Sequence, residues 1–258
     1  ENAMVQPLVL VDQSDAVVTL TLNQPERRNA LSSGMLESLL QAFREVPPAA
    51  RVVILRANGP VFSSGHDLKE LTNAGPAERE HIFALCTQVM LAIRHLPHPV
   101  IAQVQGLATA AGCQLAATCD LIVASTQAGF ATPGVKIGLF CSTPAVPLCR
   151  SVPPRKALEM LMTGAPISAA EAERLGLVNR VVQPDQLEAE TRRWAQELAE
   201  RPPDVIALGK RIYYEQLPLD VDAAYSITQS AMVENAGYAN AKEGMQAFLE
   251  KRRPVWNT

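Results

Sequence analysis

Residues 100–124 read VIAQVQGLATAAGCQLAATCDLIVA, and this stretch decides the fold class. It opens with a continuous apolar run at 100–104, turns at Gly106 and closes with a second apolar run at 121–124. Short apolar runs bounded by turn residues are typical of fully buried strands. The small residues at 110–118 favour a helix between the two. Strands joined by a helix indicate parallel pairing through a crossover, and therefore an α/β fold.

The same alternation of strand and helix extends on both sides of this stretch. Alternating apolar residues predict a strand at 17–22, and a helix follows from the apolar spacing of residues 35–43, behind Ser32 and before Pro47. We expect further strands at 52–55 and 61–62, and a helix at 77–96. Ser168 with Glu171 forms a capping-box pattern for a short helix that stops at Gly176, and a strand is expected at 178–182.

From residue 186 onward the pattern is helical only, with breaks at residues 202–203 and 217–218. We therefore predict an α/β core at residues 4–185 and a C-terminal helical region at 186–258. The chain of 258 residues is long enough for one large domain with an appendage.

Composition excludes several classes of protein. Apolar residues make up 48% of the chain and charged residues 19%, which excludes intrinsic disorder. The net charge of -3 supplies no positive excess for a nucleic acid or an anionic membrane. Residues 99–119 carry no charge, but their Gln and Thr side chains and two glycines fit a buried strand, turn and helix better than a transmembrane helix.

Five cysteines without a CxxC pair lie in apolar sequence, where thiols serve as small hydrophobic side chains. They favour a reducing compartment. Because no secretory or organellar presequence is visible, the sequence-based expectation is a cytoplasmic protein. No phosphate-loop, dinucleotide or zinc motif occurs, so neither a metal nor a redox cofactor is expected.

The candidate site residues are expected within residues 99–149. This segment holds only two charged side chains, Asp120 and Lys136. Residues 106–112 bring small side chains to a helix start, where free N–H groups and the positive end of the helix dipole can face a developing oxyanion. Tight packing of the helix on the sheet explains the same residues equally well. Residues 62–70, FSSGHDLKE, form a second polar loop after a buried strand, either part of a site or a surface turn.

Three motifs match one family in order and spacing: residues 23–31, residues 62–70 and residues 106–120. In these segments the chain resembles the enoyl-CoA hydratase/isomerase (crotonase) family, and the resemblance covers residues 17–256. It implies a spiral core of ββα units and a C-terminal helical region that forms a homotrimer, or a dimer of trimers. It also implies a CoA thioester as substrate or ligand.

The resemblance further implies the site residues. The carbonyl oxygen of the thioester would lie between the backbone N–H groups of His66 and Ala111. The nucleotide end of CoA would lie near the first two motifs, and Lys251 would reach over from a neighbouring subunit. The expected CoA-binding residues are Arg28, His66, Asp67, Leu68, Lys69 and Lys251. For the lysines and the arginine, a solvated surface position is the alternative. Asp67 is expected to hydrogen-bond within its own loop.

The chain departs from the family at two positions. The two glutamates that hydratases of the family use to hold water and move the α-carbon proton are here Gln114 and Gly134. Positioned acid–base groups contribute roughly 10²–10⁴-fold in rate, so ordinary hydration should be weak or absent. Isomerases of the family use a carboxylate near residues 141–143, where none occurs here.

The other side chains that could move a proton are His66, Cys113, Cys141 and Ser142, and packing is the favoured role of the two thiols. Two interpretations stay open. The protein is either an enzyme of the lyase or isomerase class with an unusual proton carrier, or a non-catalytic acyl-CoA-binding or regulatory protein.

Overall fold

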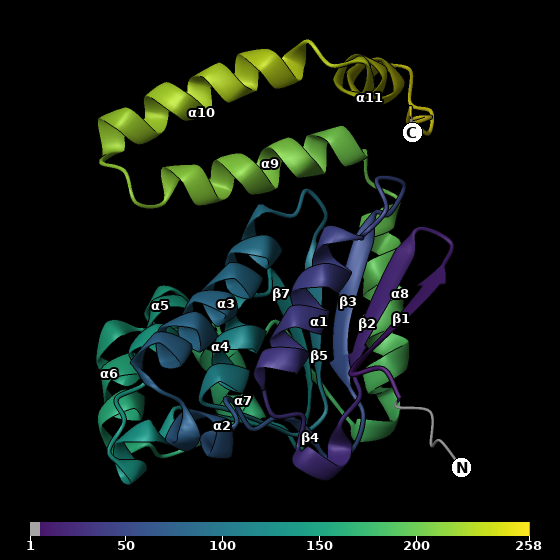
Figure 1. The fold of residues 1–258 in the computed structure, drawn as a ribbon. Coiled ribbons are helices and arrows are strands. Elements are labelled where there is room, and N and C mark those ends of the chain that lie inside the picture. Colours follow the sequence, from purple (N-terminus) through teal and green to yellow (C-terminus); the bar gives the residue numbers. More distant parts are fainter. Residues whose placement is uncertain (1–5, 258) are drawn as a thin grey trace.

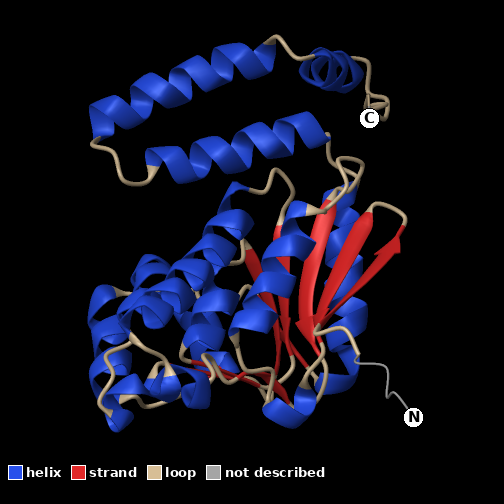
Figure 2. Ribbon diagram, in the orientation of Figure 1, coloured by secondary structure: helices blue, strands red, loops and turns tan. Residues whose placement is uncertain are grey.

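The large sheet is the centre of the molecule. The structure, a computed structural model, describes residues 6–257, so the first two residues of the predicted core lie outside it. The large sheet has six strands in the order β1-β2-β3-β5-β7-β10, and helices flank it (Figures 1 and 2). β1 pairs antiparallel with β2, and the remaining pairs are parallel. The strands are β1 (Val9–Ser14), β2 (Val17–Leu22), β3 (Val52–Ala57), β5 (Val100–Val104), β7 (Leu121–Ser125) and β10 (Arg180–Val182).

A second, smaller sheet lies at one end of the first. Its order is β4-β6-β8-β9, with bounds β4 (Val61–Ser63), β6 (Leu107–Thr109), β8 (Gly129–Ala131) and β9 (Ile167–Ser168). β4, β6 and β8 pair in parallel and follow β3, β5 and β7 directly along the chain. The chain therefore repeats one large-sheet strand, one small-sheet strand and a helix. This repeat is the ββα spiral, and it confirms the expected fold class.

The four predicted helices of the core, α1, α3, α4 and α7, begin and end close to the expected residues, whereas α2, α5 and α6 were not predicted. Ser32 caps α1 by accepting a hydrogen bond from Met35 N, and Ser168 caps α7 by accepting from Glu171 N. Gly176 ends α7 in the left-handed conformation, with φ of 88°. The helices are α1 (Ser33–Arg44), α2 (Leu68–Asn73), α3 (Pro76–His95), α4 (Ala111–Thr118), α5 (Ser142–Ser151), α6 (Pro154–Thr163) and α7 (Ala169–Leu175), with short 3₁₀ turns η1 (Pro25–Arg27), η2 (Pro133–Ile137) and η3 (Pro184–Gln186).

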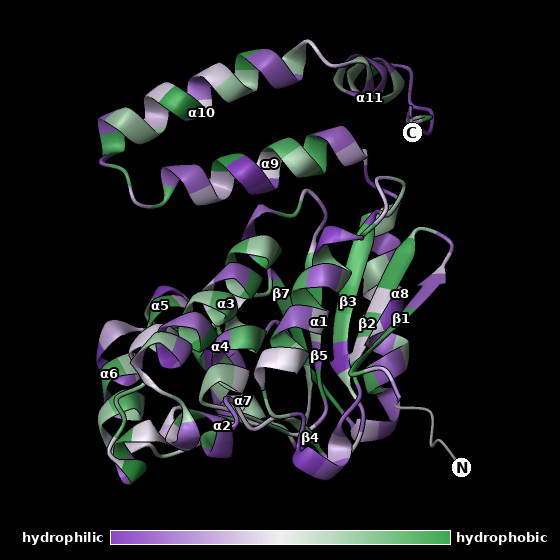
Figure 3. Cartoon of the chain, in the orientation of Figure 1, coloured by the Kyte–Doolittle hydropathy of each residue, from purple (hydrophilic) through white to green (hydrophobic). Residues whose placement is uncertain are grey.

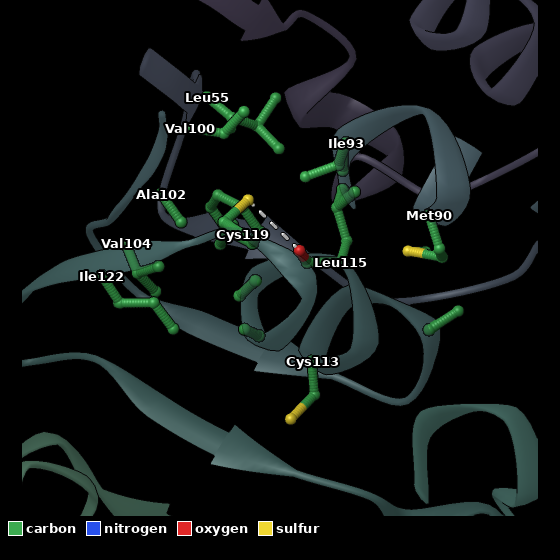
Figure 4. Close-up of a cluster of buried hydrophobic side chains, with 14 of the residues drawn as sticks. Leu55, Met90, Ile93, Val100, Ala102, Val104, Cys113, Leu115, Cys119 and Ile122 are labelled. Carbon is green, nitrogen blue, oxygen red and sulfur yellow. Dashed lines mark hydrogen bonds between the residues drawn. The ribbon is translucent and has the colours of Figure 1, made fainter. Parts of the chain in front are cut away.

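The main hydrophobic core lies between one face of the large sheet and helices α1, α3 and α4. In Figure 4, sheet residues such as Val100 and Ala102 face Ile93 of α3 and Leu115 of α4. The Cys119 thiol, also buried there, donates to the Leu115 carbonyl at 3.4 Å. Four of the five free cysteines are buried, as expected of small apolar side chains, whereas Cys149 is exposed. Burial raises the pKa of Cys86 to about 12, so this thiol stays protonated.

The opposite face of the sheet is covered by α8 (Leu187–Ala199). Its buried residues Leu187 and Ala195 pack against Val52 and Ile101 of the strands. The helical region predicted from residue 186 therefore starts with a helix that completes the core. The boundary at 185/186 stays a prediction.

Three more helices form what we call the C-terminal layer: α9 (Pro203–Gln216), α10 (Val221–Ala236) and α11 (Ala239–Leu249). Figure 1 shows them beyond one end of the core, with α9 between the core and α10. The breaks between α8, α9 and α10 lie at the predicted residues. Many apolar side chains of this layer are exposed, among them Tyr225, Met232, Val233, Phe248 and Leu249. Figure 3 shows hydrophobic residues (green) recurring along its helices. Among residues 6–257, no helix combines the length and apolar character that crossing a bilayer requires.

A buried polar cluster joins the layer to the core. The Lys210 ammonium of α9 donates to Asp120 Oδ2 at 2.7 Å and to the carbonyl oxygens of Ile93 and His98 at 2.9 and 3.0 Å. The Tyr214 hydroxyl donates to the other oxygen of Asp120 at 2.7 Å. Each charge is thus paired, as burial of an ion requires.

Candidate active site

The two polar loops predicted from the sequence meet at one end of the small sheet. β4 and β6 are parallel neighbours, so their carboxyl ends deliver Gly65-His66 and Ala110-Ala111 to the same place. Gly65 has φ of +85°, and a Cβ there would lie 2.9 Å from Ala111 N and 3.0 Å from the Thr109 oxygen. Only glycine adopts this conformation freely and allows so close an approach.

The N–H groups of His66 and Ala111 are free to bind a ligand. Within residues 6–257, neither N–H donates to a protein acceptor. Ala110, just before, has φ of +53° and ψ of -123°, a strained conformation for a residue with a side chain. Its own N–H donates to the Ala131 oxygen of β8 at 2.9 Å, which holds the strained turn in place. The Ala111 N–H also lies at the start of α4, where the helix dipole favours negative charge.

The close-packing explanation offered for the small residues at 106–112 holds. A Cβ on Gly106 would lie 2.0 Å from the Pro60 oxygen, and one on Gly112 would lie 2.3 Å from the Ser63 oxygen. The glycines therefore allow β4 and the start of α4 to pack backbone against backbone. This close packing is what places the Ala111 N–H beside the His66 loop.

The His66 ring lies against α3. It meets the Phe83 ring edge to face, with centroids 5.0 Å apart. Neither ring nitrogen has a hydrogen-bond partner among the described residues. Burial lowers the pKa of His66, against the opposing effects of the Leu31 backbone and the Glu70 carboxylate, so the ring is neutral at pH 7.

Gln114 stands one turn after Ala111 on α4. Its side chain is 5% exposed, and its Oε1 atom is buried without a hydrogen-bond partner. Gln114 also lines a cavity of about 790 Å³ between α3, α4, α5 and α9. Ala111 and Gln114 share one face of the helix, although His66 and Ala111 do not line the cavity themselves.

Gly134 has no room for a side chain. A Cβ there would lie 2.5 Å from the Leu139 carbonyl oxygen and 2.9 Å from Cys141 Sγ, and the Gly134 N–H already points at that sulfur at 3.4 Å. Its φ is not positive, so crowding, and not conformation, excludes a larger residue. Burial raises the pKa of Cys113 to about 12 and also raises the pKa of Cys141, as packing thiols require.

Buried polar atoms without a partner gather around this site. Among the described residues they include both ring nitrogens of His66, Oε1 of Gln114 and Oγ1 of Thr132. Thr132 directly follows β8, whose Ala131 oxygen holds the strained Ala110 turn. Native proteins pair nearly all such atoms, so the cluster indicates a place completed by a ligand or by water.

The residues expected at the nucleotide end fall into two groups. Arg28 lies beside the His66 loop, because its carbonyl accepts from Ser64 N at 3.0 Å. Leu68 and Lys69 are exposed on α2, next in the chain. Asp67 hydrogen-bonds within its own loop, as predicted, by capping Lys69 N and Glu70 N. Lys251 follows α11 in the C-terminal layer, so within one chain it does not join the others (Figure 1).

Two residues that shape the site were not singled out by sequence reasoning. Arg27 forms an ion pair with Asp67 and so fixes the start of α2. Asn29 is fully buried, and its side chain hydrogen-bonds Gln24 N, Asn58 O and Val61 O. Asn29 ties the first motif to the strand that leads into the second. The signal for Asn29 was its place within the first motif, whereas Arg27 is not among the matching residues of that motif.

No cluster of three metal-binding side chains occurs among the residues that the structure describes. The polar groups that the described site residues do offer are the two N–H groups, a neutral imidazole and a primary amide. Such groups bind and polarise a carbonyl oxygen.

Comparison with known proteins gives close matches. The profile of the enoyl-CoA hydratase/isomerase family matches residues 12–258. The mouse protein named enoyl-CoA hydratase domain-containing protein 3, mitochondrial, is 52% identical over 248 residues, which covers 95% of this chain and 83% of the relative.

Solved structures agree with the sequence relatives. A crystal structure of an enoyl-CoA hydratase from Mycobacterium smegmatis superposes with a TM-score of 0.96 at 48% identity, covering 98% of this chain and 100% of that one. Human enoyl-CoA hydratase domain-containing protein 3 superposes with a TM-score of 0.94 at 50% identity, covering 97% and 100%.

The expected cytoplasmic location is wrong by the same comparison. The similar mouse, rat and human proteins are all named as mitochondrial. The expectation rested on the lack of a visible presequence, and a targeting segment contributes nothing to the fold that these proteins share.

Fold, loop geometry and relatives agree, and the chain belongs to the enoyl-CoA hydratase/isomerase (crotonase) family.

Proposed function

We propose that the protein binds a CoA thioester with the carbonyl oxygen between the N–H groups of His66 and Ala111. The observation that carries this proposal is the pair of unpaired N–H groups delivered side by side by β4 and β6. A thioester oxygen gains negative charge when an enolate or tetrahedral intermediate forms. Each such donor contributes roughly 2.7–4 kcal/mol to stabilising that charge.

The rest of CoA lies along the exposed cations of the same end of the molecule. Arg28 and Lys69 are exposed beside the His66 loop and attract the phosphates of the nucleotide. Lys251 contributes from a second copy, because its own layer lies away from α2 (Figure 1). The proposed assembly is a homotrimer, or a dimer of trimers, built through the exposed apolar side chains of the C-terminal layer. No metal or redox cofactor is needed, since the N–H pair itself holds the oxyanion.

Ordinary hydration of an enoyl thioester is slow in this proposal. Gln114 has no proton to exchange, and Gly134 has neither a side chain nor space for one. The nearby thiols of Cys113 and Cys141 are protonated because burial raises their pKa. If the reaction is catalysed, the His66 ring, which is neutral because burial lowers its pKa, is the group left to accept a proton.

A second candidate is a non-catalytic acyl-CoA-binding protein. The crowding of Gly134 by the Leu139 carbonyl favours it, because restoring a carboxylate there requires the backbone at 139–141 to move. Binding without turnover then follows from an intact N–H pair beside a site that lacks acid–base groups.

Calorimetric titration with butyryl-CoA and a crotonyl-CoA hydration assay test the proposal together. We expect saturable binding, and hydration at least about a thousandfold slower than that of a hydratase that carries both glutamates. The Gln114→Glu variant should gain little hydration, because the two carboxylates act as a unit. Adding Gly134→Glu should lower the melting temperature before it restores activity. Lack of binding at millimolar concentration, or rapid hydration by the unmodified protein, would contradict the proposal.

A further inference from the structure

The cavity of about 790 Å³ between α3, α4, α5 and α9 has apolar walls and an excess of positive charge. Its apolar side chains come from α3, α5 and α9, for example Met90, Val146 and Ile206. Within residues 6–257, its charged lining residues are three cations and one anion: Arg94, Arg150, Lys210 and Asp120. A cavity of this size with apolar walls and few polar groups is typical of a small-molecule site. The excess of cations indicates a ligand that carries negative charge.

Two of these charges neutralise each other. The Lys210 ammonium lies 2.7 Å from Asp120 Oδ2, and the Tyr214 hydroxyl donates to the other oxygen of Asp120. Arg94 and Arg150 have only uncharged hydrogen-bond partners, and neither forms an ion pair with the residues that the structure describes. The cavity therefore keeps two arginines whose charge a bound anion can balance.

Arg94 is the arginine that is held in place. Its Cζ atom lies 4.4 Å from the centroid of the Tyr214 ring, and its Nη2 atom donates to the Tyr214 carbonyl at 3.2 Å. The side chain is half-buried, whereas Arg150 is exposed. A guanidinium has five N–H groups in a rigid fork, and one hydrogen bond leaves the others free to pair with a carboxylate. Arg94 is thus a fixed cation at the wall of an apolar cavity.

Gly209, in the middle of α9, keeps the space in front of that wall open. It lines the cavity, and a Cβ there would meet no atom within 4 Å. Its φ is not positive, so neither crowding nor backbone conformation requires a glycine at this position. Glycine destabilises a helix interior relative to alanine. Free space for a ligand is a reason to keep it.

The wall formed by α3 is suited to a linear apolar chain. Thr87, Met90 and Arg94 line the cavity at spacings of three and four residues, so they share one face of the helix. At 1.5 Å per residue, this face runs for on the order of 10 Å and ends at the guanidinium. His66 and Ala111 do not line the cavity, so its ligand does not have to be a thioester.

We propose that the cavity is a second ligand site, which binds an unbranched aliphatic chain with a terminal carboxylate. The carboxylate accepts hydrogen bonds from Arg94, and the chain lies along α3 in the space that Gly209 leaves open. This proposal goes beyond the proposed function, because the N–H pair takes no part in it. Two sources supply the same chemistry: a free fatty acid, and a thioester whose acyl chain ends in a second carboxylate.

Calorimetric titration with octanoate and octanol tests the proposal, because the two ligands have the same chain and differ in charge. In the unmodified protein we expect octanoate to bind at least about tenfold more tightly, the gain from a charge-assisted pair. Arg94→Gln can still donate to the Tyr214 carbonyl but carries no charge, so the ratio should fall close to one while octanol binds as before. Arg94→Lys keeps the charge without the fork and should retain part of the preference.

Arg79→Gln is the matched control. Arg79 lies on the same helix, is exposed and does not line the cavity, so the ratio of the unmodified protein should be unchanged. A thermal melt of each variant accompanies the titrations.

A second variant tests the place of the chain. Gly209→Leu fills the open space from α9 and should weaken both octanoate and octanol at least about tenfold. Leucine is a better helix former than glycine, so the melting temperature should not fall. Gly209→Ala adds a single methyl group and should have a smaller effect on both ligands.

Titration with octanedioyl-CoA and octanoyl-CoA distinguishes the two sources of the carboxylate. If the second carboxylate of a thioester occupies the site, octanedioyl-CoA binds more tightly, and Arg94→Gln removes the difference. If the site takes free fatty acids, the two thioesters bind equally and octanoate alone depends on Arg94.

Three results would overturn the proposal. The first is equal affinity of the unmodified protein for octanoate and octanol. The second is a preference for octanoate that survives Arg94→Gln, because another group then holds the carboxylate. The third is undiminished binding by Gly209→Leu, because the chain then lies elsewhere. Octanoate binding without binding of any thioester would refute the proposed function and leave this site in place.

Discussion

The core buries its large apolar side chains, whereas the C-terminal layer leaves many of them exposed. In the core, Leu20, Leu55 and Phe62 are fully buried, and glycines such as Gly112 pack backbone against backbone. In the layer, Phe248 is 83% exposed. Burial of a large apolar side chain contributes about 1.5–3 kcal/mol, which the core gains within one chain and the layer does not. The difference teaches that the core gains its stability within one chain, whereas the exposed apolar side chains of the layer fit the partner surface of the proposed assembly.

The largest expected effect comes from adding one methyl group to a helical glycine in each region. Gly112→Ala places a Cβ 2.3 Å from the Ser63 oxygen, a buried backbone atom that cannot turn away, and we expect a loss of about 4 kcal/mol or more. Gly209→Ala in α9 meets no atom within 4 Å and should stabilise by about 0.5–1 kcal/mol. Urea unfolding measures both. Similar values for the two variants would remove the contrast between the regions.

The second largest loss of stability is expected at the buried polar cluster that joins the C-terminal layer to the core. Lys210→Met leaves Asp120 without its buried cation, which should cost about 3 kcal/mol. The matched control is Lys156→Met, which removes another ion-paired lysine, one that bridges Glu159 and Glu171 at the surface and should cost less than about 1 kcal/mol. Thermal melts compare the two. Equal losses of stability would mean that the buried cluster holds α9 no more strongly than a surface ion pair would.

The smallest effect on the stability of the core is expected from introducing charged side chains on the C-terminal layer. Val233→Asp with Phe248→Asp should dissociate the proposed assembly to single chains of 27.9 kDa in light scattering. The two tryptophans separate the regions, because Trp194 lies on α8 under Arg180 and Trp256 packs on Gly244 of α11. Unfolding followed at Trp194 should shift by less than about 1 kcal/mol. A monomeric mass for the unmodified protein at micromolar concentration would show that the layer has no partner.

Sequence reasoning found the long elements and missed the short or polar ones. β1 escaped because its outer residues, from Val11 to Ser14, are exposed at the sheet edge and carry no alternation. β6, β8 and β9 have two or three residues, too few for any period to show. α5 contains Pro144 and Pro147, which read as helix breakers.

The candidate site was found through its motifs, and its surroundings were not. The chain order of Gly65-His66 and Ala110-Ala111 was enough to predict the N–H pair once the family resemblance was seen. The cavity beside Gln114 could not be predicted from the sequence. It is bounded by α3, α4, α5 and α9, and the sequence does not show that these separate helices meet.

The sequence by itself determined the alternation of strands and helices, the membership of the family and the absence of carboxylates at residues 114 and 134, because these follow from residue type and order. Only the tertiary structure decided that Gly134 has no space for a carboxylate and that the Gln114 amide has no partner. Both facts depend on atoms brought near from elsewhere, the Leu139 carbonyl in one case and the cavity wall in the other. The type of each side chain is known from the sequence, whereas the space around a side chain and its hydrogen-bond partners are set only when distant segments pack together.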